Sequence, residues 1–195
     1  MAPDPMPRGF RLPRLCLPRP GIDLRRWAVI ACDQYTSEPE YWARVAAEVG
    51  DAPSTLNLIF PEVYLEQPDA PQRIGRIQQA MRNALAQGQL VDHDGAVLVR
   101  RTADGRTRHG LMLELDLEHY DFSPVSQSLI RPTEGTIVAR LAPRVAVRRQ
   151  AGLELPHILV LIDDPQGTVI EPLAAARDTP PRLYDTDLML GGGHV

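Results

Sequence analysis

A polar segment at residues 128–136 holds the side chains best suited to chemistry in this 195-residue chain. Arg131 offers a two-pronged donor for a phosphate or a carboxylate, and Glu134 is a candidate general base. The other residues expected to bind an anion beside them are Thr133, Thr136 and Arg140, and Arg144 accompanies this segment. This set suits recognition of a phosphoryl or carboxylate group better than nucleophilic hydrolysis. The competing interpretation is an ion pair between Arg131 and Glu134 that only fixes a loop.

A second polar run, at residues 33–37, separates an expected strand from an expected helix. Polar groups placed after a strand and beside a helix N-terminus are well suited to binding an anion. Asp33 is a candidate catalytic residue, as a proton acceptor or a metal ligand. The candidate substrate-binding residues of this run are Tyr35, Thr36 and Ser37. Alternatively, Asp33 and Ser37 only cap the helix and Tyr35 fills the rim of the core.

Two adjacent carboxylates, Asp163 and Asp164, follow an apolar run at residues 157–163. Paired carboxylates at a strand end are candidate ligands for Mg²⁺, which a nucleotide substrate brings with it. The same residues before Pro165 are equally typical of a turn. Mg²⁺ and a nucleotide are therefore the candidate cofactors.

The C-terminal residues contain Asp185, Asp187 and three glycines before His194. Such a loop could bind an anion through its backbone amides. Because chain ends are commonly disordered, this segment is expected to fray. The spacing of the histidines predicts no zinc site.

Apolar periodicity predicts a mixed α/β (α+β) fold, in which a mixed sheet with a hairpin is flanked by helices. The expected strands are residues 27–32, 55–60, 96–101, 108–117 and 157–163. The expected helices are residues 37–50, with Ser37 as the N-cap, and 72–87, closed by Gly88. Residues 137–147 are expected to form two short strands or a helical turn. Asp104-Gly105 predicts a tight hairpin.

Composition favours a proline- and arginine-rich irregular arm at residues 1–21 and a single domain at residues 22–195. The net charge of −4 argues against general affinity for nucleic acid. No apolar run approaches the roughly 20 residues that cross a bilayer, and the N-terminus lacks the apolar stretch of a signal peptide. We therefore expect a cytoplasmic protein whose partner is a small-molecule ligand, with neither nucleic acid nor membrane as a partner.

Six motifs resemble the bacterial and archaeal family called domain of unknown function 1015. They lie at residues 27–42, 53–65, 106–111, 128–136, 155–165 and 183–194. The resemblance implies that relatives continue beyond Val195, so the chain is expected to be an N-terminal part, a short variant or a truncated form. Many members carry a histidine where Thr133 stands, so no role of that histidine transfers to this chain. The family is also distantly similar to the fold shared by the partition protein ParB, sulfiredoxin and free-serine kinases.

These residues favour an enzyme that acts on a small anionic metabolite. The more specific hypothesis is that its reaction is Mg²⁺–nucleotide-dependent phosphoryl transfer, as in an amino-acid kinase. The first alternative is a non-catalytic ligand-binding or regulatory module. The second is an inactive truncated fragment. The sequence leaves the substrate, the metal and the oligomeric state open.

Overall fold

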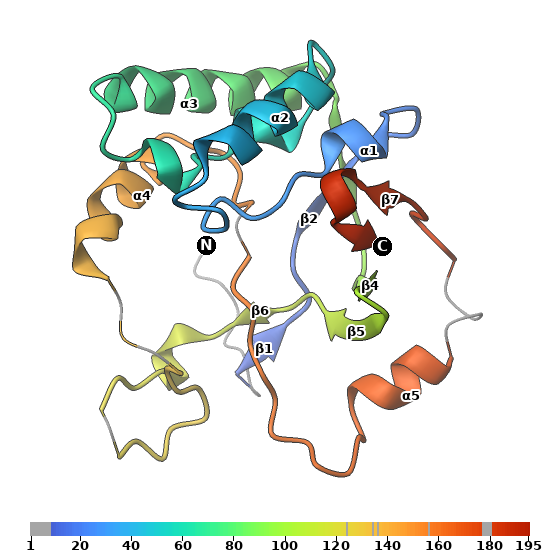
Figure 1. Cartoon of the computed structure of the whole chain (residues 1–195). Coiled ribbons are helices and arrows are strands. Elements are labelled where there is room, and N and C mark those ends of the chain that lie inside the picture. The colour runs from blue at the N-terminus through green and yellow to red at the C-terminus, as the bar shows by residue number, and fades with distance from the viewer. Residues whose placement is uncertain (1–8, 124, 134, 136, 156, 177–180) are drawn as a thin grey trace.

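The computed structural model describes residues 9–123, 125–133, 135, 137–155, 157–176 and 181–195 (Figure 1). The fold is mixed α/β, as predicted, with two longer helices lying together above a set of short antiparallel sheets. The α-helices of the described residues are α1 (Leu24–Trp27), α2 (Pro39–Val49), α3 (Ala70–Ala86), α4 (Leu141–Arg148) and α5 (Ile170–Ala175). Short 3₁₀ helices are η1 (Thr55–Leu58), η2 (Glu62–Tyr64), η3 (Leu117–His119), η4 (Val138–Arg140) and η5 (Met189–Gly191).

Eight short strands form three antiparallel sheets within the described residues. The strands are β1 (Phe10–Arg11), β2 (Leu15–Pro18), β3 (Leu90–His93), β4 (Leu98–Ala103), β5 (Arg106–Leu111), β6 (Glu114–Leu115), β7 (Asp187–Leu188) and β8 (Gly193–His194). β1 pairs with β6, β2 pairs with β3, and the third sheet has the order β5-β4-β8-β7. The predicted hairpin joins β4 to β5, and Asp104 and Gly105 have φ values of 50° and 70°, as its two-residue turn requires.

The two long helices follow their sequence signals. α2 begins with Pro39 in its first turn and gives way to Gly50, but Glu38 rather than Ser37 occupies the N-cap position, without a side-chain capping bond. α3 ends in a Schellman motif, in which Gly88 has a φ of 61° and the Gln89 amide donates to the Ala84 carbonyl over 2.9 Å.

The core consists of two apolar clusters under these helices. The first contains Trp27, Leu58, Phe60, Ile77, Met81 and Ala84. The second contains Tyr41, Trp42, Val45, Val49, Ile59 and Met189. Met189 of η5 therefore anchors the C-terminal segment against α2, and residues 187–194 form β7, η5 and β8 instead of the frayed end that was expected.

Two of the expected strands, residues 27–32 and 55–60, are wrong because side-chain hydrogen bonds replace strand pairing there. Trp27 ends α1, and its carbonyl accepts from the Thr55 hydroxyl over 2.7 Å and from the Ser54 hydroxyl over 3.3 Å. Ser54 also caps η1 by accepting from the Leu56 amide over 3.2 Å. These contacts hold residues 55–58 in η1, while residues 28–31 form a connection without helix or strand.

Two further expectations need revision, and the helical alternative for residues 137–147 is confirmed. Residues 157–163, predicted as a strand, form no helix or strand, and all of them are exposed. Residues 10–11 and 15–18, placed in an irregular arm, form β1 and β2 because β6 and β3 supply antiparallel partners. The segment 137–147 is helical, as η4 and the start of α4. Among the described residues, the helices are too short or too polar to cross a membrane.

Candidate functional site

A buried carboxylate, Glu62, lies between two arginines of α4 and its preceding turn. The Glu62 side chain is 4% exposed, whereas those of Arg140 and Arg144 are 39% and 42% exposed. Arg144 Nη2 donates a hydrogen bond to Glu62 Oε1, and Arg140 Nη1 lies 2.9 Å from Oε2. Within the described chain, no donor is aligned on Oε2 in hydrogen-bond geometry, so Arg140 acts on this oxygen through its charge.

The fold holds this carboxylate in place through its backbone. The Glu62 amide donates to the Cys32 carbonyl over 2.9 Å, which ties η2 to the loop before α2. Glu62 follows the buried residues Ile59 and Phe60, so the chain enters η2 from the core. A carboxylate on such a path must be paired with positive charge, because an isolated buried charge is too costly.

The two arginines face Glu62 because they are four residues apart in a helical segment. Gln78 of α3 fixes the far end of α4, since its side-chain amide donates to the carbonyls of Ala146 and Val147 over 2.9 Å and 3.3 Å. Like charges at this spacing repel each other, and the carboxylate of Glu62 offsets that repulsion. The loop at Cys32, the helix η2 and the segment from η4 to α4 are distant in sequence, and they meet at one charged cluster.

Cys32 borders the same cluster. Burial raises the pKa of the Cys32 thiol, the negative charge of Asp33 raises it further, and the charge of Arg144 opposes both. The group is consequently a neutral thiol at physiological pH. The predicted residue Asp33 lies next to this thiol and is itself exposed.

The other residues of the run at 33–37 mostly serve packing. The ring of Tyr35 stacks on Tyr41 with centroids 3.8 Å apart, and its carbonyl accepts from the Trp42 indole over 3.3 Å. Thr36 is half-buried and Ser37 is exposed. Tyr35 thus covers the rim of the second core cluster, which agrees with the packing interpretation of this residue.

The predicted site at residues 128–136 is described only in part. Arg131 and Thr133 are exposed and follow the bridge between Tyr120 and Ile130. Glu134 and Thr136 lie outside the described residues, so the expected pairing of Arg131 with Glu134 stays a prediction. Of the described residues predicted with this segment, the structure brings Arg140 and Arg144 into a charged cluster.

Asp163 and Asp164 lie between the exposed segment and α5. Asp163 is exposed, and the Asp164 carboxylate accepts from the Thr168 hydroxyl over 2.9 Å and from the Val169 amide over 2.8 Å. The hydrogen bond from the Thr168 backbone, followed by that of Val169, holds the pKa of Asp164 below its ordinary value. This geometry is that of a turn before a helix.

An open hollow of about 320 Å³ lies beside Asp164. Its lining residues are Thr107, His109, Ile162, Asp164, Ile170 and Glu171. Two carboxylates in this lining make it a poor place for an anion. Among the residues that the structure describes, His, Cys, Asp and Glu side chains form no group of three suited to a metal ion.

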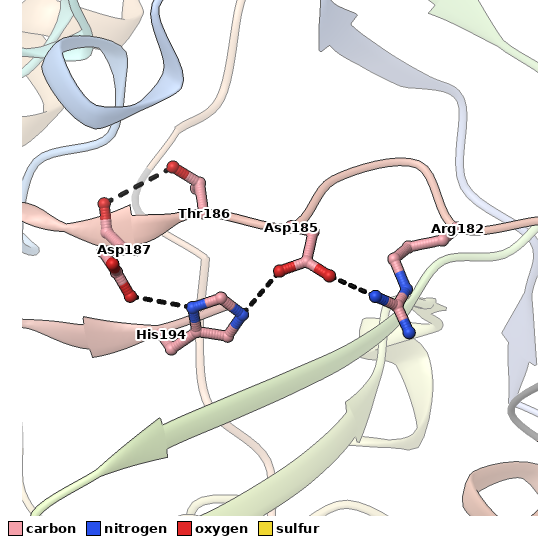
Figure 2. A network of polar contacts seen from close by, with 5 residues as sticks. All are labelled: Arg182, Asp185, Thr186, Asp187 and His194. Atoms are coloured by element: carbon pink, nitrogen blue, oxygen red, sulfur yellow. Dashed lines mark hydrogen bonds and ion pairs between the residues drawn. The ribbon is translucent and has the colours of Figure 1, made fainter.

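The C-terminal sheet carries a second charged network (Figure 2). Asp187 and His194 are opposite each other in the β7–β8 register, and His194 Nδ1 lies 2.9 Å from Asp187 Oδ1. His194 Nε2 lies 2.7 Å from Asp185, whose other oxygen pairs with Arg182. The bond to Asp187 is the main reason that the pKa of His194 is raised. When His194 is protonated, it and Arg182 balance the two carboxylates, so the charges of this network pair with one another.

Sequence reasoning missed Glu62 as a site residue. The available signal was a lone carboxylate inside the apolar run at residues 58–65, combined with two arginines at helical spacing. A charge in such a run must be either a cap or a buried partner of a cation. The second possibility points to paired arginines elsewhere in the chain.

The fold and the cluster define a mixed α/β protein with a surface arginine pair built on a buried carboxylate. The family model described as protein of unknown function (DUF1015) matches residues 16–195. The chain therefore belongs to this family, as its motifs predicted. Comparison with curated proteins and with solved structures gives no match. The distant similarity to the ParB and sulfiredoxin fold accordingly stays a prediction.

Proposed function

We propose that this protein binds a small anionic metabolite, through a carboxylate or phosphate group, at the guanidinium groups of Arg140 and Arg144. The observation that carries the proposal is the shared use of Glu62 by both arginines. Two positive charges face one negative charge, so the cluster keeps an excess positive charge at a surface position. The cytoplasmic setting expected from the sequence belongs to the same proposal.

The donors of these arginines favour an oxyanion as the ligand. A guanidinium group carries five N–H donors in a rigid plane, and Glu62 engages only one side of each group. The remaining donors of both side chains can bind one oxyanion in two-pronged geometry. Because Glu62 already holds the side chains in place, little side-chain entropy is lost on binding.

Exposure favours binding over turnover as the primary function. Side chains that are 39% and 42% exposed would hold an anion at the surface, where water competes for it. The non-catalytic ligand-binding module is therefore the form of the proposal that the geometry supports best. Phosphoryl transfer is the finer hypothesis, in which Arg131 and Arg140 clamp the phosphate group and Glu134 is the general base. In this hypothesis Asp33 and Asp163 orient the substrate or Mg²⁺, with Asp164 as a further metal ligand.

The binding proposal is tested by titrating the protein with inorganic phosphate and with citrate, using calorimetry and the NMR signals of arginine side chains. Arg140→Gln and Arg144→Gln should each weaken binding about tenfold, because each removes a charge-assisted contact. Arg149→Gln is the matched control, since this exposed arginine follows α4. Equal losses of affinity in all three variants would show that only the overall positive charge of the surface matters. That result would overturn the proposal.

Turnover is tested separately by incubating the protein with Mg²⁺–ATP and a panel of amino and hydroxy acids. ADP formation that depends on the acid and is abolished in Asp33→Asn would establish the phosphotransferase form. Phosphate binding without ADP formation would leave the binding module as the function.

A further inference from the structure

Residues 157–163 form the longest exposed apolar run among the described residues. The exposed fractions are 89% for Ile158, 75% for Leu159, 47% for Val160, 78% for Leu161 and 54% for Ile162. This segment lies between α4 and α5 in the chain and forms neither helix nor strand (Figure 1). In the described chain, the backbone groups of residues 157–163 make no backbone hydrogen bond. The segment therefore has the apolar composition of a central β-strand. Among the described residues, no strand pairs with it.

The sequence of this run reads almost the same in both directions from Val160. Leu159 and Leu161 flank it, and Ile158 and Ile162 lie one step further out. The outermost residues are His157 at one end and Asp163 at the other, which can carry opposite charges. An antiparallel pair reverses one strand against the other, so such a sequence is complementary to itself.

We infer that two copies of this chain associate by antiparallel pairing of residues 157–163 around a two-fold axis at Val160. In this arrangement Ile158 lies opposite Ile162 of the second copy, and Leu159 lies opposite Leu161 of the second copy. His157 lies opposite Asp163 of the second copy at each end of the ladder. Backbone groups without a partner in one chain then find partners in the other.

The choice of a second copy over another partner rests on this symmetry. A contact that is the same on both subunits must be self-complementary, and the run meets that condition in shape, in apolar character and in charge. Pairing also gives each apolar side chain a neighbour on the facing strand. Ile162 already lines the hollow together with Ile170 of α5. The facing strand adds Ile158 of the second copy next to it.

Disulfide trapping tests the register. In a background with Cys16→Ser and Cys32→Ser, Val160→Cys should give a covalent dimer under mild oxidation, because residues opposite each other have Cα atoms about 5 Å apart. Ile158→Cys is the matched control on the same face. Its two copies lie four residues apart along the ladder, roughly 13 Å, which is too far for a disulfide. Equal crosslinking of both variants would overturn the register.

Sedimentation velocity over a hundredfold range of protein concentration tests whether the charged residues at the two ends of the ladder contribute to the dimer. His157→Asp places carboxylates opposite one another and should weaken the dimer about tenfold. Adding Asp163→Arg to this variant restores opposite charges and should restore the dimer. Tryptophan fluorescence checks that each variant is folded. A protein that is monomeric throughout, that forms polydisperse aggregates, or whose double variant stays weak contradicts the inference.

Discussion

Replacing Glu62 by glutamine removes the charge of the buried carboxylate and keeps its shape. Breaking a buried ion pair costs about 3–5 kcal/mol, whereas an exposed pair contributes about 0.2–1 kcal/mol. The Glu62 side chain is 4% exposed and its arginine partners are about 40% exposed, so this cluster lies between those limits. Exchanging charge-assisted contacts for neutral ones lowers each by about 1 kcal/mol. We expect Glu62→Gln to lower the free energy of unfolding by about 1–2 kcal/mol.

Urea unfolding followed by tryptophan fluorescence measures this loss. Trp27 and Trp42 are both buried, one in each core cluster, so the signal reports the whole core. In a protein of this size, 1 kcal/mol corresponds to about 2–4 °C in Tm. Glu66→Gln is the control, because Glu66 is exposed and close in sequence, and it should change stability by less than about 0.5 kcal/mol.

A double-mutant cycle separates the ion pair from other effects of the substitution. Glu62→Gln combined with Arg144→Gln should lose less stability than the two single variants together, since each already breaks the same contact. A Glu62→Gln variant as stable as Glu66→Gln, or full additivity in the cycle, would refute a structural carboxylate shared by the arginines. In that case Glu62 would not hold the two arginines of the proposed binding site in place.

Three further predictions concern the core, a helix end and the C-terminal network. Trp42→Ala should lower the free energy of unfolding by about 3–5 kcal/mol in urea melts, because its side chain is 1% exposed. Gly88→Ala should cost about 1–2 kcal/mol by calorimetry, because φ is 61° there while the space around it is open. In NMR titrations His194 should lose its proton above the ordinary pKa of about 6.5. Its ion pairs are then complete below that pH and are lost as pH rises through the raised folded-state pKa. Asp187→Asn should move this transition back toward the ordinary value, and an unmoved transition would contradict the assigned contact.

Local signals in the sequence predicted the elements whose structure is decided locally. Helical spacing of apolar residues predicted α2 and α3, and Asp104-Gly105 predicted the hairpin, because these elements carry their own hydrogen bonds. Short strands such as β2 and β8 escaped prediction. β2 depends on the distant strand β3, and β8 depends on the distant strand β4 as well as on the neighbouring strand β7.

The candidate site divides in the same way. Arg140 was predicted as an anion ligand from its residue type, and the structure places it in a charged cluster. Its partner Glu62 is 78 positions away and was not predicted, because the lone carboxylate in its apolar run indicates a buried cation partner but not which residue supplies it. Residue types therefore led to the proposed class of ligand, while the position of the candidate site depended on tertiary packing.

The run at residues 157–163 shows that an apolar pattern alone is not enough to form a strand, because these residues are exposed and form no strand. β-branched and leucine side chains favour an extended strand, yet a strand exists only when a second backbone pairs with it. Local preference and tertiary structure therefore disagree at this run, although they agree at α2 and α3. Pairing with a second copy would remove the disagreement, since it supplies both the missing hydrogen bonds and the missing apolar neighbours. An engineered monomer, such as Val160→Pro, should then leave the two core clusters intact, because this run belongs to neither of them. Loss of folding in Val160→Pro, seen as loss of the tryptophan signal, would instead place the run in the fold of the single chain.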